Sequence, residues 1–236
     1  MPKILSGDET LLSSLSESKA VSRRKFLGYS GAAAIAIAGL AACNDKDNNM
    51  DPNAIDLGSG DVGILNYAYA LEQLEAAFYI KVLTTPYTGG SVAEMALMAD
   101  IRDHEIAHRE FFKNAIPAAS RLQDLTPDFS TINFADRTSV LGAAKAFEDL
   151  GVSAYNGAGK LIVTPAYLTL AGKIVSVEAR HAAWIRDIIA DGTFADSTVI
   201  DSNGLDKSRT PPEVLAIANT YLSVGSKVSA SNLPTS

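Results

Sequence analysis

The sequence predicts an all-α protein, built as a four-helix bundle with one long crossover connection and a further helix near the C-terminus. Three observations point to this class. The 236-residue chain is rich in alanine and poor in alternating β-branched residues, a composition that favours helices. Four stretches of helical length repeat apolar residues at helical spacing. The connections between them are short, long and short, which is the pattern of two antiparallel helix pairs joined by a crossover.

The first 42 residues resemble an export signal. Arg23 and Arg24 precede an apolar run from Gly28 to Ala42, and this order resembles a twin-arginine translocation signal. The run is too short for a comfortable membrane span. It ends at Cys43, the single cysteine, in the string Leu-Ala-Ala-Cys that resembles a bacterial lipoprotein cleavage box. We expect a lipid on Cys43 that anchors the protein in the cell envelope, on the periplasmic face or the cell surface. An uncleaved tail with a chance cysteine is the alternative.

The segment after the cysteine is polar and acidic. Residues 43–60 are expected to form a flexible tether. The net charge of the chain is −7, and residues 1–42 hold five basic and three acidic side chains, so the rest holds 15 basic and 24 acidic ones. Such an acidic chain without a basic stripe argues against nucleic acid as a partner.

The first two helices follow the tether. The first is expected from about Val62 to Leu83, with Asp61 as its N-cap and Thr85-Pro86 as its end. After a turn, the second runs from Ser91, a suitable N-cap, to about Ala115, before Pro117. The short turn makes these two helices an antiparallel pair.

The second pair begins after a long polar connection, residues 117–137. The third helix is expected over about 138–158 and the fourth over about 165–190, with a proline in its first turn. A fifth, shorter helix is expected from Pro211 to about Val228. The expected parts of the chain are a signal peptide, a tether, the bundle, and a loop with a C-terminal helix packing on the bundle: residues 1–42, 43–60, 61–191 and 192–236.

Two short stretches of the same chemistry lie in the middle of the second and fourth helices. Glu105–His108 and Glu178–His181 each begin with glutamate and end with histidine, three residues apart on one helical face. Each has a partner glutamate on the preceding helix, Glu72 for the first and Glu148 for the second. Each partner is followed by leucine two residues on and tyrosine seven residues on. The chain therefore contains an internal repeat that indicates a pseudo-twofold bundle.

Six ionisable side chains thus point from four helices into an apolar core. Four carboxylates cannot share such a core without counter-charge, because repulsion and desolvation would cost several kcal/mol each. Two metal ions would supply that charge. Mixed carboxylate and imidazole ligands suit iron or manganese, and zinc also accepts them. The predicted metal ligands are Glu72, Glu105, His108, Glu148, Glu178 and His181.

With these residues, the chain from about 61 to 191 resembles the ferritin-like superfamily, and within it the branch that includes the desiccation-related proteins. The resemblance implies that Glu105 and Glu178 bridge the two metals, and it places Tyr79 near the site. It also implies oxidoreductase chemistry with dioxygen or peroxide, in oxidative or envelope stress. A metal-binding or structural stress protein without turnover stays open, as does a homodimer.

Glu75 breaks the symmetry of the repeat. Its counterpart in the second half is Gly151, and a glycine inside a helix costs about 1 kcal/mol relative to alanine. We expect that Gly151 leaves room which Glu75 fills, as an extra ligand or as a base beside the metals. Glu75 and Tyr79 are therefore the candidate catalytic residues.

Residues 104–108 also read His-Glu-Ile-Ala-His, the string of zinc proteases. In that alternative His104 and His108 bind zinc and Glu105 acts as the base. The repeat argues against it, because the counterpart of His104 is Val177. We expect His104 to lie at the surface or beside the ligands.

Overall fold

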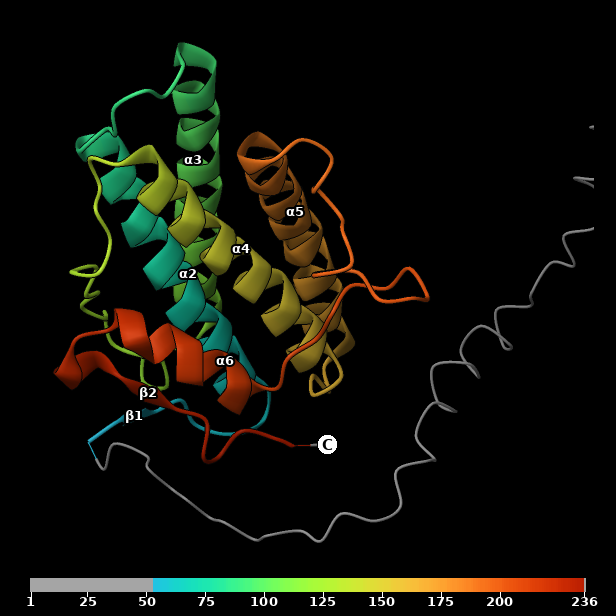
Figure 1. Ribbon diagram of the computed structural model, residues 1–236. Helices are drawn as coiled ribbons and strands as arrows, with labels where there is room; N and C mark the ends of the chain where they lie inside the picture. Colours follow the sequence, from blue (N-terminus) through green and yellow to red (C-terminus); the bar gives the residue numbers. More distant parts are fainter. Residues whose placement is uncertain (1–52, 236) are drawn as a thin grey trace, which may run out of the picture. The chain divides into compact units, whose positions relative to one another are not determined.

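The structure, a computed structural model, describes residues 53–235. The expected signal peptide, Cys43 and the first part of the expected tether lie outside this range. Four long helices form the bundle (Figure 1), and the expected all-α class is confirmed. Their bounds are α2 Gly60–Thr84, α3 Val92–Ala115, α4 Arg137–Gly159 and α5 Pro165–Ile189. No helix in the described part is long and apolar enough to cross a membrane.

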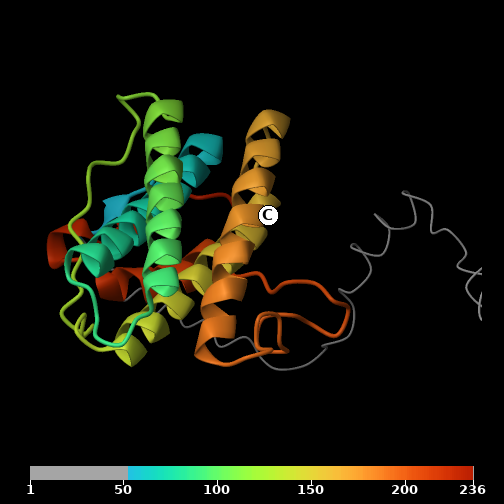
Figure 2. The ribbon, with the colours of Figure 1, turned by 90° about the horizontal axis from the view of Figure 1, so that it is seen from above.

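The four helices pack as two pairs, α2 with α3 and α4 with α5. Helix α2 is buried along most of its length, with polar residues among its buried side chains, and lies at the centre of the core. Figure 2 shows α3 and α5 on the same side of the bundle. Each of these two helices buries a narrow stripe, and this stripe carries its glutamate of the repeat. The arrangement gives every helix one face toward a common centre.

The crossover between α3 and α4 is held against α2 by buried amide side chains. Asn66 donates to the carbonyl of Ser120 at 2.7 Å and accepts from the amide of Leu122 at 2.9 Å. Two helical turns further along α2, Gln73 accepts from the amide of Leu125 at 2.7 Å. Because a side-chain amide both donates and accepts, it can replace the backbone partners that a loop lacks. These contacts guide the crossover along α2.

Ser91 and Asp61 were expected to be the N-caps of the first two helices, and the structure differs at Asp61. The side chain of Ser91 accepts from the amide of Glu94 at 3.0 Å, as expected of an N-cap. Asp61 does not cap α2, because the helix begins at Gly60, two residues earlier than expected, with Ser59 at the N-cap position. Its carboxylate instead accepts from the amides of residues 163 and 164 at 2.8 Å. Those amides precede α5 and have no helical partner of their own, so Asp61 ties the start of α2 to the α4–α5 connection.

The C-terminal helix is shorter than expected. Helix α6 spans Pro211–Ala218 and packs against α4, and two 3-10 turns, Asn219–Tyr221 and Val224–Ser226, follow it. The Asn219 side chain donates to the carbonyl of Val228 and accepts from its amide, both at 2.9 Å. This pairing turns the chain back, which is why the helix does not continue to Val228.

A two-stranded parallel sheet replaces the end of the expected tether. Strand β1, Ile55–Asp56, pairs with β2, Val228–Ser229. Leu57, directly after β1, is fully buried. The expectation of a flexible tether up to residue 60 is therefore wrong for this last part, because the parallel pairing and one buried leucine hold it to the C-terminal segment.

The loop between α5 and α6 is fastened by a buried arginine. Arg186 is 2% exposed and donates to Asp149 at 2.6 Å, to Asp196 at 2.8 Å and to the carbonyl of Thr193 at 3.0 Å. A buried guanidinium requires such paired acceptors. Arg186 therefore joins α5, α4 and the loop that follows.

Candidate metal centre

The six side chains of the repeat come together in the centre of the bundle. The four glutamates are 0% exposed. Their potential ligand atoms form two groups, and within each group these atoms lie within 4.8 Å of one another. Glu105 and Glu178 belong to both groups. The first group is Glu72, Glu105, His108 and Glu178, and the second is Glu105, Glu148, Glu178 and His181.

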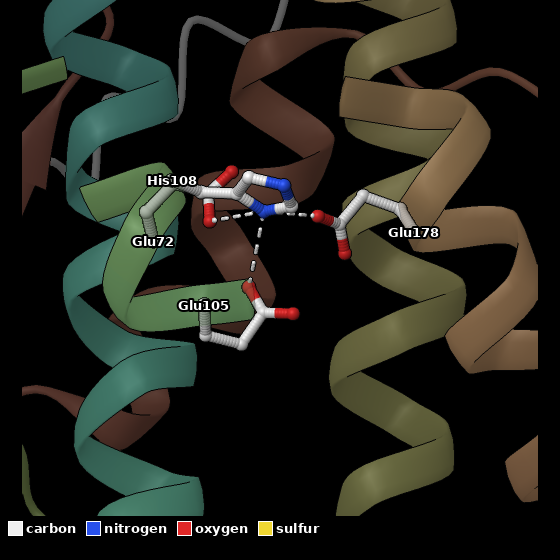
Figure 3. Close-up of side chains that lie close together, drawn as sticks. All are labelled: Glu72, Glu105, His108 and Glu178. Atoms are coloured by element: carbon white, nitrogen blue, oxygen red, sulfur yellow. Dashed lines mark ion pairs between the residues drawn. The ribbon is translucent and has the colours of Figure 1, made fainter. Parts of the chain in front are cut away.

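His108 lies at the middle of the first group (Figure 3). Its Nδ1 atom is 2.9 Å from Glu178 Oε1, 3.4 Å from Glu72 Oε2 and 3.6 Å from Glu105 Oε2. Figure 3 shows the three carboxylates arriving from three different helices around one ring nitrogen. The packing of α2, α3 and α5 thus converges on a single point.

His181 repeats this arrangement in the second group. Its Nδ1 atom is 2.9 Å from Glu105 Oε1, 3.5 Å from Glu148 Oε2 and 3.7 Å from Glu178 Oε2. Each histidine is thus closest to the glutamate that begins the other histidine's motif. The two groups are related as the sequence repeat predicts.

The atoms that face the centre lack hydrogen-bond partners among the described residues. Buried polar atoms are nearly always paired, so a set of unpaired ones at one place requires an explanation. The nitrogen and oxygen atoms are close, but they are not aligned for hydrogen bonds. Lone pairs directed at a common point suit a metal ion. The unpaired atoms are Glu72 Oε2, Glu148 Oε2, both carboxylate oxygens of Glu105 and of Glu178, and Nδ1 of His108 and of His181.

This donor set fits metal ions. Glu105 and Glu178 belong to both groups, and each leaves both carboxylate oxygens without a hydrogen-bond partner. Glu72 and Glu148 each belong to one group, and each leaves one oxygen without a partner. These residues could therefore hold metal ions.

Two tyrosines bind the remaining oxygens of Glu72 and Glu148, the outer glutamates, each of which belongs to only one group. Tyr79 donates its hydroxyl to Glu148 Oε1 at 2.5 Å, and Tyr155 donates to Glu72 Oε1. Tyr79 was expected near the site on the resemblance, whereas Tyr155 was not among the predicted site residues. The signal was present, since both tyrosines occupy the same place in the repeat. Each hydroxyl fixes one oxygen and leaves the other directed at the centre.

The carboxylates differ in how readily they ionise. Burial raises the pKa of Glu105 well above its ordinary range, and the charge of Glu178 adds to this. Burial likewise raises the pKa of Glu148, to about 7. Burial alone would raise the pKa of Glu178 as well, but the close contacts with His108 and His181 lower it below its usual value. Four such carboxylates need a positive charge among them.

The two histidines respond to the same environment in the opposite sense. Burial alone would lower the pKa of His108, but its contacts with Glu105, Glu178 and Glu72 raise it to about 12. Burial would also lower the pKa of His181, but its contacts with carboxylates raise this pKa to about 12. The protein environment thus strongly favours cations between the glutamates.

Glu75 lies in the room left by Gly151, as expected. Its Oε1 atom is 3.0 Å from the position that a Cβ atom on Gly151 would occupy. Its side chain is 4% exposed, and burial, with the charges of the ligand carboxylates, raises its pKa well above the ordinary range. It is a member of neither potential ligand group, so in the described chain it lies beside these groups.

His104 contacts the second histidine ligand and not the first. Its Nδ1 atom is 2.9 Å from Nε2 of His181, and the two rings stack with centroids 5.1 Å apart. It belongs to neither ligand group. The zinc-protease alternative requires His104 and His108 to bind the same ion. In the described chain they do not share a potential ligand group, which argues against it. The expectation that His104 lies at the surface beside the ligands agrees with its exposed side chain and with this contact.

Comparisons with known proteins support the family suggested by the residues. A family model described as a ferritin-like domain matches residues 60–191, the four long helices and the connections between them. No curated protein matches the chain.

Proposed function

The chain belongs to the family of ferritin-like domains, and from this premise we propose that it holds two ions of iron or manganese and reacts there with dioxygen or peroxide. The observation that carries the proposal is the set of eight buried, unpaired atoms, from six side chains, that face one centre. Carboxylate and imidazole donors in this ratio suit redox-active first-row metals. A purely structural network would leave these atoms paired with one another.

When bound here, two ions that each change oxidation state by one would supply two electrons. This is enough to reduce dioxygen with two protons to hydrogen peroxide, or to transfer two electrons between two hydrogen peroxide molecules, which become two waters and dioxygen. The protein contributes positions and protons. Glu105 and Glu178, which belong to both groups, would hold both ions, and the hydroxyls of Tyr79 and Tyr155 fix Glu148 and Glu72. The buried surroundings limit competing reactions with water.

Metal analysis of protein expressed in its native compartment tests the first step. We expect two iron or manganese ions per chain, with a matching optical or magnetic-resonance spectrum. Glu178→Gln removes a carboxylate shared by both groups and should weaken both positions, whereas Glu148→Gln should weaken only the His181 position. Protein that contains no metal, or one zinc per chain, would contradict the proposal.

Assays with dioxygen and with hydrogen peroxide test the second step. The reduced, metal-loaded protein should be oxidised by one of them faster than free metal in the same buffer. Metal binding without any such reaction would favour the alternative, a metal-binding stress protein without turnover.

Glu75 is proposed to hold the proton that this chemistry exchanges, since it is a buried carboxyl beside the ligands that the ligand groups do not use. Glu75→Gln keeps the shape of the side chain and removes the exchangeable acid. We expect unchanged metal content and a loss of reactivity of about 100-fold, the lower range for a positioned acid or base. Equal reactivity of the variant and the parent protein would rule out this role.

We also propose that the protein is exported and anchored through a lipid on Cys43. The support is the order of twin arginine, apolar run and cysteine in the sequence. Labelling of cells with a fatty-acid analogue should tag the protein, and Cys43→Ala should abolish the tag. Replacing Arg23 and Arg24 with lysine should retain the protein in the cytoplasm, and a lysine variant that still leaves the cytoplasm would contradict the export route.

A further inference from the structure

An apolar pocket lies between the four long helices, at the end of the bundle where α3 and α4 end and α2 and α5 begin. All four helices contribute to its lining. Representative residues are Ala68 and Leu71 from α2, Phe112 from α3, Tyr155 from α4, and Tyr167 and Ala171 from α5. Half-buried Tyr167 and Ala171 on the outer helix α5 place one side of the pocket near the surface.

The inner end of the pocket adjoins the metal centre. Tyr155, which lines the pocket, donates its hydroxyl to the ligand Glu72. Phe112, also in the lining, follows His108 by one helical turn on α3. A molecule in this pocket is therefore separated from the first ligand group by one side chain.

The lining offers almost nothing to a polar guest. Among its side chains only three tyrosines carry a polar atom. The hydroxyl of Tyr155 is already bonded to Glu72, so the one buried hydroxyl of the lining without a hydrogen-bond partner in the described part of the chain is that of Tyr67. Hydrogen peroxide would therefore lose most of its hydrogen bonds with water on entering, which is unfavourable. Dioxygen has no such bonds to lose.

The size of the pocket also favours a very small molecule. The cavity volume is about 30 Å³, which suits one molecule of two or three atoms and is far below the 300–1,000 Å³, roughly, of organic ligand sites. We propose that this pocket binds dioxygen and admits it to the Glu72 side of the centre, in preference to hydrogen peroxide. The inference rests on the proposed function and selects between its two oxidants.

Xenon tests the binding directly, because it is apolar, of similar size and visible to X-rays. The metal-loaded full-length protein, crystallised and held under xenon pressure, should show a xenon atom between Ala68, Phe112 and Tyr155. A pocket that contains ordered water in place of xenon would overturn the proposal.

Kinetics of a filled pocket test the route. Ala171→Phe places a ring in the pocket from half-buried α5, and Ala166→Phe puts the same ring on the same helix at an exposed position outside the lining. In stopped-flow experiments on reduced, metal-loaded protein, Ala171→Phe should slow oxidation by dioxygen at least fivefold. Its oxidation by hydrogen peroxide should stay within twofold of the parent, and Ala166→Phe should change neither rate.

The two levels of failure can be told apart. If the parent reacts with dioxygen and Ala171→Phe reacts equally fast, or if both oxidants slow together, the pocket is not the route. If the metal-loaded parent reacts with neither oxidant, the proposed function itself is wrong and the inference falls with it.

Discussion

Tyr79 and Tyr155 each lie seven residues after a glutamate on their own helix, yet each donates to the glutamate of the other helix. The exchange leaves one oxygen of each outer glutamate fixed and the other free. It also links α2 and α4 at two places. At the residue scale, the centre is therefore defined as much by the groups behind the ligands as by the ligands.

Removal of a tyrosine hydroxyl should have opposite consequences at two positions of the same pocket. Tyr155→Phe removes a hydrogen bond to a buried carboxylate and should cost about 1.5–3 kcal/mol of unfolding free energy. Tyr67→Phe removes a buried hydroxyl that has no partner in the described chain, so stability should be unchanged or slightly higher. Urea unfolding of both variants measures this, and an equal loss at both positions would show that Tyr67 has a partner of comparable strength.

His104 is expected to position His181. A second group on the far nitrogen of a histidine ligand fixes its tautomer and orientation, and removing such a group weakens metal affinity about 10–100-fold. His104→Val copies the residue at the matching place of the repeat. Competition titration should show weaker metal binding at the His181 position and unchanged binding at the His108 position.

The control for His104 is Asp103→Ala, an exposed neighbour paired with Arg102, which should alter neither affinity. A spectrum of the bound metal separates positioning from general damage, because only the signal of one ion should change. Restoration by His104→Gln, which can still hydrogen-bond to Nε2 of His181, would support the role, and equal loss at both metal positions would contradict it.

At the scale of elements, the starts of α3 and α4 are joined by one ion pair. Arg137 at the first residue of α4 donates to Glu94 in the first turn of α3 at 2.8 and 2.9 Å, and Tyr87 donates to the same carboxylate at 2.6 Å. Hydrogen bonding to Arg137 holds the pKa of Glu94 below its ordinary value of 4.5. The contact links the two halves of the repeat away from the centre.

This ion pair should give the stability a defined pH dependence. Because the pKa of Glu94 is lower in the folded chain than in the unfolded one, its contribution is complete above about pH 5 and is lost as the pH falls through the folded-state value. Glu94→Gln should therefore cost about 1 kcal/mol or less at pH 7 and progressively less toward pH 3. Denaturation at several pH values measures this. Glu110→Gln, which removes an exposed pair with Arg109, is the control and should show a smaller difference.

At the scale of the whole molecule, the bundle surrounds a cluster of buried carboxylates. Among the side chains of the two groups, only His108 and His181, when protonated, carry the opposite charge. All four long helices contribute side chains to this centre. Asn66 and Gln73 hold the crossover along α2. The N- and C-terminal parts of the described chain pair as β1 and β2. The fold therefore concentrates its repulsion at one point. An ion bound there should stabilise every helix at once.

Removal of metal should lower the stability of the whole bundle in a single transition. A ligand at about 1,000 times its dissociation constant stabilises by about 4 kcal/mol, and for a domain of this size each kcal/mol shifts the midpoint by about 2–4 °C. Chelation should therefore lower the thermal midpoint by about 10 °C. Metal affinity should rise with pH, because the ion displaces protons from His108 and His181, whose pKa values of about 12 keep them charged otherwise.

Calorimetric titration in two buffers of different ionisation enthalpy counts these protons, and at least two per chain are expected, from His108 and His181. Glu178→Gln protein treated with the same chelator is the control and should show a much smaller shift. An unchanged midpoint of the parent protein after complete metal removal would contradict a central metal site.

The sequence by itself determined the helices, their order and the six inward-facing side chains that could bind metal. This was possible because helical spacing is local: residues three apart share a face wherever the helix lies. The same repeat also indicated that Gly151 and Glu75 share one space. Local signals failed at the ends of the bundle, where Asp61 pairs with another loop and Asn219 ends α6 early.

Only the tertiary structure decided which groups meet across helices. That Tyr79 pairs with Glu148, that His104 faces His181 and not His108, and that Arg186 is buried between two aspartates all depend on the register and crossing of helices far apart in sequence. Packing fixes such registers through the shapes of many side chains together, and no short pattern carries that information. The ligands could be named from the sequence, but their supporting groups and the apolar pocket beside them could not.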